Sequence, residues 1–112
     1  MARYLAIFIG AASATQKPAI SPEQSQGFMA AWAAWARRHA AAIVDPGTPL
    51  AATKRVDVDG IADISNACTA FMIVEAGDHE AAALLFADHP HVALLPGNAV
   101  EVMECPPLPG TG

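Results

Sequence analysis

The sequence is poor in basic residues, in cysteine and in long apolar runs. Lysine and arginine together number 6 against 11 Asp and Glu, a formal net charge of −5 over 112 residues. Binding along nucleic acid or to an anionic membrane surface depends on a basic excess, so neither is expected as a partner. No apolar run approaches the ~20 residues that a bilayer-spanning helix needs. The two cysteines, Cys68 and Cys105, are too few for a disulfide scaffold and are expected as reduced, buried thiols.

Several short motifs with known chemistry are also missing. The chain has no glycine-rich phosphate loop, no Gly-x-Ser-x-Gly elbow, no Cys-x-x-Cys pair and no dinucleotide-binding fingerprint, so no cofactor is expected. Ala12-Ser13-Ala14 resembles the cleavage site of a secretory signal. The preceding basic region is one residue, however, and its apolar stretch is near the lower length limit, so we expect a cytoplasmic location.

What the sequence does contain is an alternation of apolar strands and amphipathic helices. Strands are expected over residues 4–9, 43–44, 69–74 and 99–105. Between residues 48 and 63, a weak strand is expected to reach a turn at Asp59-Gly60. The first helix begins at Ser21, because Ser21-Pro22-Glu23-Gln24 combines an N-cap, a first-turn proline and a capping box. Its apolar stripe consists of Phe28, Trp32, Trp35 and His39, widened by Met29 and Ala36.

The second helix is expected to begin at the N-cap Asp78 and to end before Pro90. The spacing predicts a buried stripe of Ala81, Leu84, Leu85 and Asp88. A carboxylate on such a stripe needs a partner or hydrogen bonds. Asp88 is for this reason a candidate functional residue.

The order strand–helix–strand–strand–helix–strand predicts an α+β fold, a ferredoxin-like βαββαβ sandwich with an antiparallel sheet and two helices on one face. Residues 1–105 form this single domain, and residues 106–112 form a Pro/Gly-rich C-terminal tail. The strands are apolar on both sides while helices cover only one. We therefore expect a homodimer in which the two open sheet faces pack together. In this strand order the first strand pairs with both the third and the last strand, so Cys68 and Cys105 lie two strands apart, too far for a disulfide.

The order and spacing of the motifs resemble those of the YCII-related proteins, in particular the DGPF-domain branch, over residues 3–105. The residues that carry the resemblance are the Ser-Pro-Glu helix start with paired tryptophans, residues 44–50 (VDPGTPL), 71–76 (FMIVEA), Glu80-Ala81-Ala82, His89-Pro90-His91 and 97–102 (GNAVEV). The resemblance implies a dimeric α/β barrel. Most members of the family have no assigned activity. One is a dehydrochlorinase acting on a chlorinated hydroxyquinone, with a proposed His–Asp pair. The stretch corresponding to that histidine, residues 23–27, contains none here.

The candidate catalytic group is His91, an acid or base oriented by Asp45 or Asp88. Each has a structural alternative. His89 and His91 could cap the end of the second helix, and Asp45 in Asp-Pro-Gly could form a turn. The two histidines could also share a metal, which requires a third ligand, so no metal site is assigned. Pocket candidates are Tyr4, Trp32 and His89, for which packing in the core or at an interface is the alternative.

Together these observations favour a small homodimer that binds a small molecule in a pocket between sheet and partner. A lyase- or isomerase-type enzyme acting on a small cyclic or hydroxylated metabolite, using His91 with Asp45 or Asp88, is the first alternative. A regulatory or structural dimer without pocket chemistry is the second.

Overall fold

The computed structural model describes residues 1–10 and 21–109. The signal-like Ala12-Ser13-Ala14 lies outside this part of the chain, and so do the last three residues of the tail. Within the described ranges, no helix is both long enough and apolar enough to cross a membrane.

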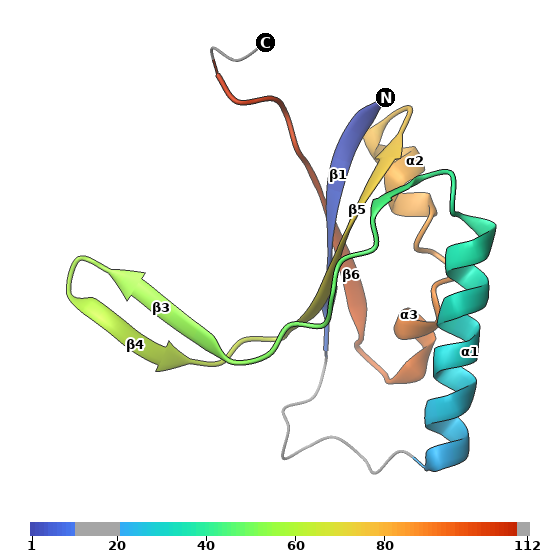
Figure 1. Cartoon of the computed structure of the whole chain (residues 1–112), viewed down its shortest axis with the longest axis horizontal. Helices are drawn as coiled ribbons and strands as arrows, with labels where there is room; N and C mark the ends of the chain where they lie inside the picture. Colours follow the sequence, from blue (N-terminus) through green and yellow to red (C-terminus); the bar gives the residue numbers. More distant parts are fainter. Residues whose placement is uncertain (11–20, 110–112) are drawn as a thin grey trace.

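A four-stranded antiparallel sheet forms the centre of the fold (Figure 1). Its strands are β1 (Ala2–Ile9), β2 (Ile43–Asp45), β5 (Cys68–Ala76) and β6 (Ala99–Glu104), in the order β2-β5-β1-β6. The expected pairing of the first strand with both the third and the last strand of the sheet is confirmed. This architecture is α+β and compatible with a ferredoxin-like fold.

Helix α1 (Pro22–Arg38) begins where the sequence predicts. Ser21 Oγ accepts from the backbone N–H of Gln24 at 3.1 Å, and the Gln24 side chain accepts from the N–H of Ser21 at 3.0 Å. This reciprocal pair satisfies two donors that a helix start otherwise leaves without partners. Of the predicted stripe, Trp35 is fully buried, and Met29 is an exception because it is 63% exposed.

The predicted second helix is in fact two helices, α2 (His79–Leu84) and α3 (Pro90–Leu94). Asp78 caps α2 as expected. Pro90 begins α3 rather than only stopping the helix before it, because the first helical position has no need of an N–H donor. The predicted buried stripe is wrong already within α2, because the helix turns a different side to the core. Ala82 and Phe86 are buried, whereas Leu84 is 64% exposed.

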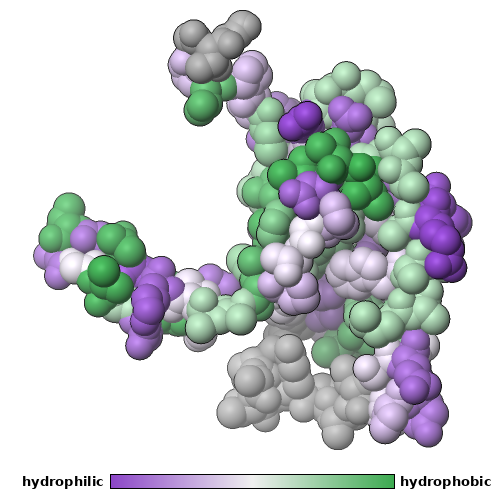
Figure 2. Space-filling view, viewed as in Figure 1, coloured by the Kyte–Doolittle hydropathy of each residue, from purple (hydrophilic) through white to green (hydrophobic). Residues whose placement is uncertain are grey.

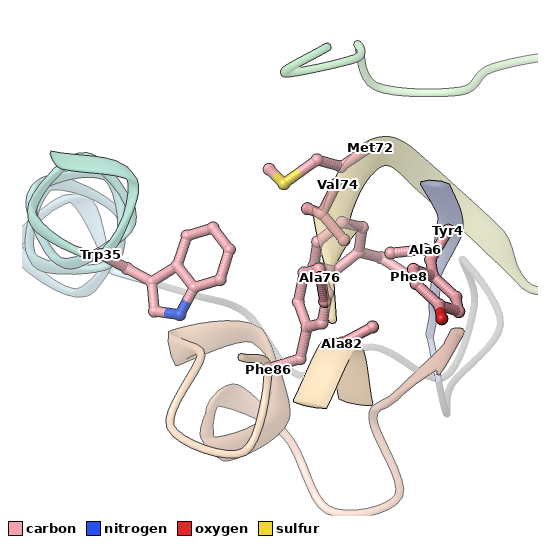
Figure 3. Packing of buried hydrophobic residues seen from close by; sticks show 9 residues of the cluster. All are labelled: Tyr4, Ala6, Phe8, Trp35, Met72, Val74, Ala76, Ala82 and Phe86. Carbon is pink, nitrogen blue, oxygen red and sulfur yellow. The ribbon is translucent and has the colours of Figure 1, made fainter. Parts of the chain in front are cut away.

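The hydrophobic core lies between the sheet and the three helices (Figures 1 and 3). Trp35 on α1 reaches towards Phe86 and towards the sheet residues Met72 and Val74. The Trp35 and Phe86 rings stack with centroids 5.2 Å apart. The indole Nε1–H of Trp35 donates to the Leu85 carbonyl at 3.0 Å, so this large side chain is buried with its polar atom satisfied.

The opposite face of the sheet carries apolar side chains that no helix covers. Tyr4, Ala6 and Phe8 face the helices, so Leu5 and Ile7 point to the other side. In the strand register Leu5 lies opposite Ile73 and Met103, and Ile7 lies opposite Phe71 and Glu101. Directly paired residues share a face, so these side chains form one patch, called the open face below.

Residues 53–64 form a separate hairpin, called the arm below, built from β3 (Thr53–Asp57) and β4 (Gly60–Ile64). Its loop is Val58-Asp59, one residue earlier than predicted, and its second strand was not expected. Asp57 Oδ1 accepts from the N–H of Asp59 at 2.9 Å, and Gly60 has φ +127°, which explains the glycine after the loop. Figure 1 shows the arm on the side of the sheet opposite the helices.

Both cysteines are free thiols, as the strand order predicts. Cys68 is half-buried and Cys105 is exposed, so the expectation of buried thiols is wrong for Cys105. Cys105 follows the last residue of β6, where the chain leaves the sheet for the tail.

Candidate functional site

A pocket of about 450 Å³ opens between the sheet and the helices, at the end of β1 where Gly10 lies. Its apolar walls are Phe28, Met29 and Trp32 from α1 and Leu94 and Leu95 at the end of α3, and β5 borders it along residues 69–71. Residues 46–49 of the loop after β2 form the remaining wall. The pocket is built from one chain on the helix-covered side, whereas the sequence interpretation placed a pocket between sheet and partner.

Asp45 shapes the rim of this pocket without lining it. Its Oδ1 accepts from the N–H of Gly47 at 2.8 Å, which is the turn role considered for it from the sequence. Gly47 has φ +71°, and a Cβ there would lie 1.8 Å from the Phe71 carbonyl oxygen. Only glycine therefore lets this loop run so close to β5.

His91 lines the pocket and is 6% exposed. Its Nε2 lies 2.9 Å from the carbonyl oxygen of Ile9, at the end of β1. A carbonyl only accepts, so Nε2 carries the proton, and Nδ1 is the acceptor of the neutral ring. The ring also stands edge-on to Phe8, with centroids 5.4 Å apart, which fixes its plane.

The structure does not bring His91 together with the predicted acids. Asp88 is exposed and pairs with Arg38 at 3.3 Å on the surface, so its predicted place on a buried stripe is wrong. The buried side of this segment runs through Ala82, Phe86 and His89, so Asp88 points to solvent. The Asp45 carboxylate is already engaged in the hydrogen bond that shapes its own turn. Within the described residues, the hydrogen bond found for the His91 ring goes to a backbone carbonyl rather than to a carboxylate.

His89 is the N-cap of α3, not a cap for the end of α2. Its Nδ1 accepts from the backbone N–H of His91 at 3.0 Å. The side chain is 1% exposed and its ring packs against those of Trp32 at 4.3 Å, Trp35 at 4.6 Å and Phe8 at 4.9 Å. His89 is therefore a core residue that positions His91 through the backbone, and it does not line the pocket.

This environment favours the neutral form of His89. Burial first, and then the nearby ring of His91, lower the pKa of His89 from 6.5 to about 4. The Asp88 carboxylate raises the pKa of His89, whereas His39, like His91, lowers it. In addition, Nε2 of His89 is buried without a hydrogen-bond partner among the described residues. A second proton would also occupy Nδ1 and remove the cap of α3.

Acid is therefore expected to destabilise the protein through His89. Between pH 6.5 and 4 the unfolded chain takes up a proton at this position and the folded chain does not. The contribution of His89 to the free energy of unfolding is complete above pH 6.5. It decreases as the pH is lowered, by about 3 kcal/mol at pH 4. Urea unfolding of the wild type and of His89→Asn between pH 7 and 4 measures this loss of stability, because asparagine keeps a cap acceptor but does not titrate. The loss should shrink in His89→Asn and persist in the surface control His79→Asn. Equal losses in all three proteins would contradict the assignment.

Of the predicted pocket candidates, Trp32 lines the pocket and Tyr4 does not. Tyr4 lies near the other end of β1, on the helix-covered face, with its ring stacked on that of His79 at 5.3 Å. Burial, followed by the carboxylates of Glu104 and Asp78, raises the pKa of Tyr4. Tyr4 therefore packs in the hydrophobic core, which is the alternative considered for it from the sequence.

The polar part of the pocket includes residues that the sequence reasoning missed. Asn98 is buried, and its Nδ2 donates to the His91 carbonyl at 3.1 Å. The Thr69 hydroxyl donates to the Phe8 carbonyl at 3.0 Å. Both line the pocket, and Thr48 completes the polar side. The only sequence signal was Gly97-Asn98 directly after a helix, which equally indicates an ordinary turn.

No group of three or more His, Cys, Asp or Glu side chains that could hold a metal ion occurs among residues 1–10 and 21–109. A scan against protein-family models finds no match to the chain, and a search of curated proteins finds none either. The resemblance to the YCII-related proteins therefore stays a prediction.

Proposed function

We propose that this protein is a YCII-related homodimer that binds a small, uncharged and largely apolar molecule in the pocket beside His91. The observation that carries the proposal is the pocket itself. Its volume of about 450 Å³ lies within the range of small-molecule sites. Its walls are aromatic and aliphatic, with a few polar groups at one side, which is the usual composition of such sites.

The lining residues define the class of ligand. None of those described is Asp, Glu, Lys or Arg. A charged ligand would lose its hydration there without gaining a counter-charge, which is costly. An aromatic or aliphatic ring with a hydroxyl group fits better, because the hydroxyl can donate to Nδ1 of His91 while the ring contacts Trp32 and Phe28.

A second candidate function is catalysis of a lyase or isomerase type, with Nδ1 of His91 as the base. The hydrogen bond from Nε2 to the Ile9 carbonyl favours it, because it fixes the tautomer and orientation that a general base needs. Neither Asp45 nor Asp88 supports His91 in this arrangement, so ligand binding remains the first proposal.

The open face supports the homodimer. Leu5, Ile7, Phe71 and Ile73 are only half-buried within one chain, and Met103 is 40% exposed. A second sheet packed on this patch would remove these side chains from water, at about 25 cal/mol for each Å² of apolar surface buried. An isologous pair of open faces is the simplest closed arrangement, since the same patch serves both chains.

Filling the pocket is expected to abolish ligand binding. Thr48 is an exposed residue at the pocket wall, and Thr48→Trp would place an indole across the opening. We expect the affinity for a neutral hydroxylated aromatic probe, 2-naphthol, to fall at least about tenfold, measured by calorimetric titration. The control Ala51→Trp puts the same ring on the same loop outside the lining and should bind like the wild type. Equal binding by the two variants would place the probe elsewhere.

A further inference from the structure

The arm exposes an apolar pair, Val56 and Ile61, that no other described part of the chain buries. Val56 and Ile61 lie opposite each other in the hairpin register and are 72% and 71% exposed. Figure 2 shows the arm as a projection clear of the body, with hydrophobic as well as hydrophilic side chains along it. A lone two-stranded hairpin is marginally stable in water at best. Its regular pairing from Thr53↔Ile64 to Asp57↔Gly60 is therefore expected to be supported by a contact beyond the hairpin itself.

The charges of the arm argue against nucleic acid or an anionic surface as that support. Lys54 pairs with Asp63 at 2.5 Å, and Arg55 pairs with Asp57 at 3.1 Å. Both cations of the arm are thus neutralised within it. Asp59 adds a further negative charge at the loop. No basic stripe is left for phosphate groups, so the Val56–Ile61 face is the part of the arm suited to binding.

The position of the arm identifies the second copy as the occupant. The arm extends from the same side of the sheet as the open face, away from the helices (Figure 1). Five-residue strands span ~17 Å, and packed sheets lie ~10 Å apart. An arm of this length that leaves the sheet on its open side reaches past a second sheet seated there. In a dimer joined through the open faces, each arm must therefore run beside its partner.

We propose that each arm clasps a second copy of this chain, with Val56 and Ile61 packed against that copy. The inference rests on the proposed homodimer and adds to it a second contact, outside the sheet-to-sheet interface. It gives the exposed Val56 and Ile61 side chains a partner, and it explains how a hairpin that projects from the described body of the chain keeps its register. By symmetry the two arms make the same contact, so the exposed apolar residues of both arms are covered within one closed dimer.

The test compares charges placed on the two faces of the arm. Val56→Asp and Ile61→Asp change the proposed contact face, whereas Ala62→Asp changes the other face, since Ala62 pairs with Arg55. Sedimentation equilibrium should show the dimer dissociation constant raised at least about tenfold by each of the first two substitutions and unchanged by Ala62→Asp. A wild-type chain that is monomeric at about 100 µM would remove the proposed homodimer itself. A wild-type dimer whose dissociation constant none of the three substitutions changes would overturn the arm contact alone.

Hydrogen exchange of the unaltered protein gives an independent readout that needs no variant to fold. Amides of β3 and β4 should be protected at concentrations where the dimer forms and lose protection on dilution to the monomer. A docked arm predicts this dependence on concentration. Protection that is absent in the dimer, or equal in dimer and monomer, would contradict the contact.

Discussion

Replacing Trp35 by alanine is expected to lower the free energy of unfolding by about 4 kcal/mol, measured by urea denaturation. Trp35 is fully buried and stacks on Phe86, so alanine leaves a large cavity between α1 and the rest of the core. The Leu85 carbonyl also loses the donor of its 3.0 Å hydrogen bond. Both effects act in the same direction and at the junction of α1 with the α2–α3 segment.

A matched variant separates the two effects. Trp35→Phe keeps most of the ring packing and removes only the indole N–H, so its loss should be roughly half that of Trp35→Ala. Trp32 is only half-buried at the pocket, and Trp32→Phe should cost less than Trp35→Phe. A loss below about 1 kcal/mol for Trp35→Ala would mean that α1 does not pack on the core as described.

Placing a carboxylate in the middle of the open face is expected to separate the proposed homodimer. Ile7 lies on the central strand β1, between Phe71 and Glu101 of the neighbouring strands. Ile7→Asp would bury one charge from each chain in the interface and set it beside Glu101. We expect the dimer dissociation constant to rise by about 10³ or more, measured by sedimentation velocity over a dilution series.

Two controls accompany this experiment. Ala33→Asp introduces the same charge on the exposed side of α1 and should leave the dimer intact. Met103→Asp changes an already 40% exposed residue on the edge strand β6, so it should weaken the dimer even if Ile7→Asp fails to fold. If both open-face variants remain dimers of wild-type affinity, the chains associate through some other surface.

The parts of the fold that the sequence predicts correctly are those specified by local signals. The capping box at Ser21 and Gln24 fixes the start of α1 within a single turn, and both of its hydrogen bonds are present. The apolar runs at residues 4–9 and 69–74 are long enough to mark the central strands. Their pairing then follows from the small number of topologies open to a four-stranded α+β sheet.

The errors occur where the local pattern allows more than one choice of buried side. The stripe after Asp78 was placed on Leu84 and Asp88, which are exposed, whereas Ala82 and Phe86 are buried. The single predicted helix is also divided, because the chain turns after Leu84 and restarts at Pro90. The misplaced stripe made Asp88 a catalytic candidate. It also hid the role of His89, whose ring nitrogen caps α3 from a buried position that sequence spacing cannot reveal.

The candidate site was predicted only in part, because its residues are distant in the chain. Trp32 and His91 were named from the sequence, and both line the pocket. Asn98 and Thr69 bond to backbone atoms of other elements, and no spacing rule predicts such contacts. The close approach of Gly47 to Phe71, which closes one wall, is likewise visible only in three dimensions.

The most direct test of the proposed function is to map a bound probe onto the chain by two-dimensional NMR of the ¹⁵N-labelled protein. During titration with 2-naphthol, we expect amide shifts at Gly10, Thr69, His91 and Asn98, and none of these shifts in Thr48→Trp. Shifts confined to the open face, around Ile7 and Ile73, would place the ligand between two sheets and contradict the pocket. Absence of shifts at millimolar probe would contradict binding of this ligand class altogether.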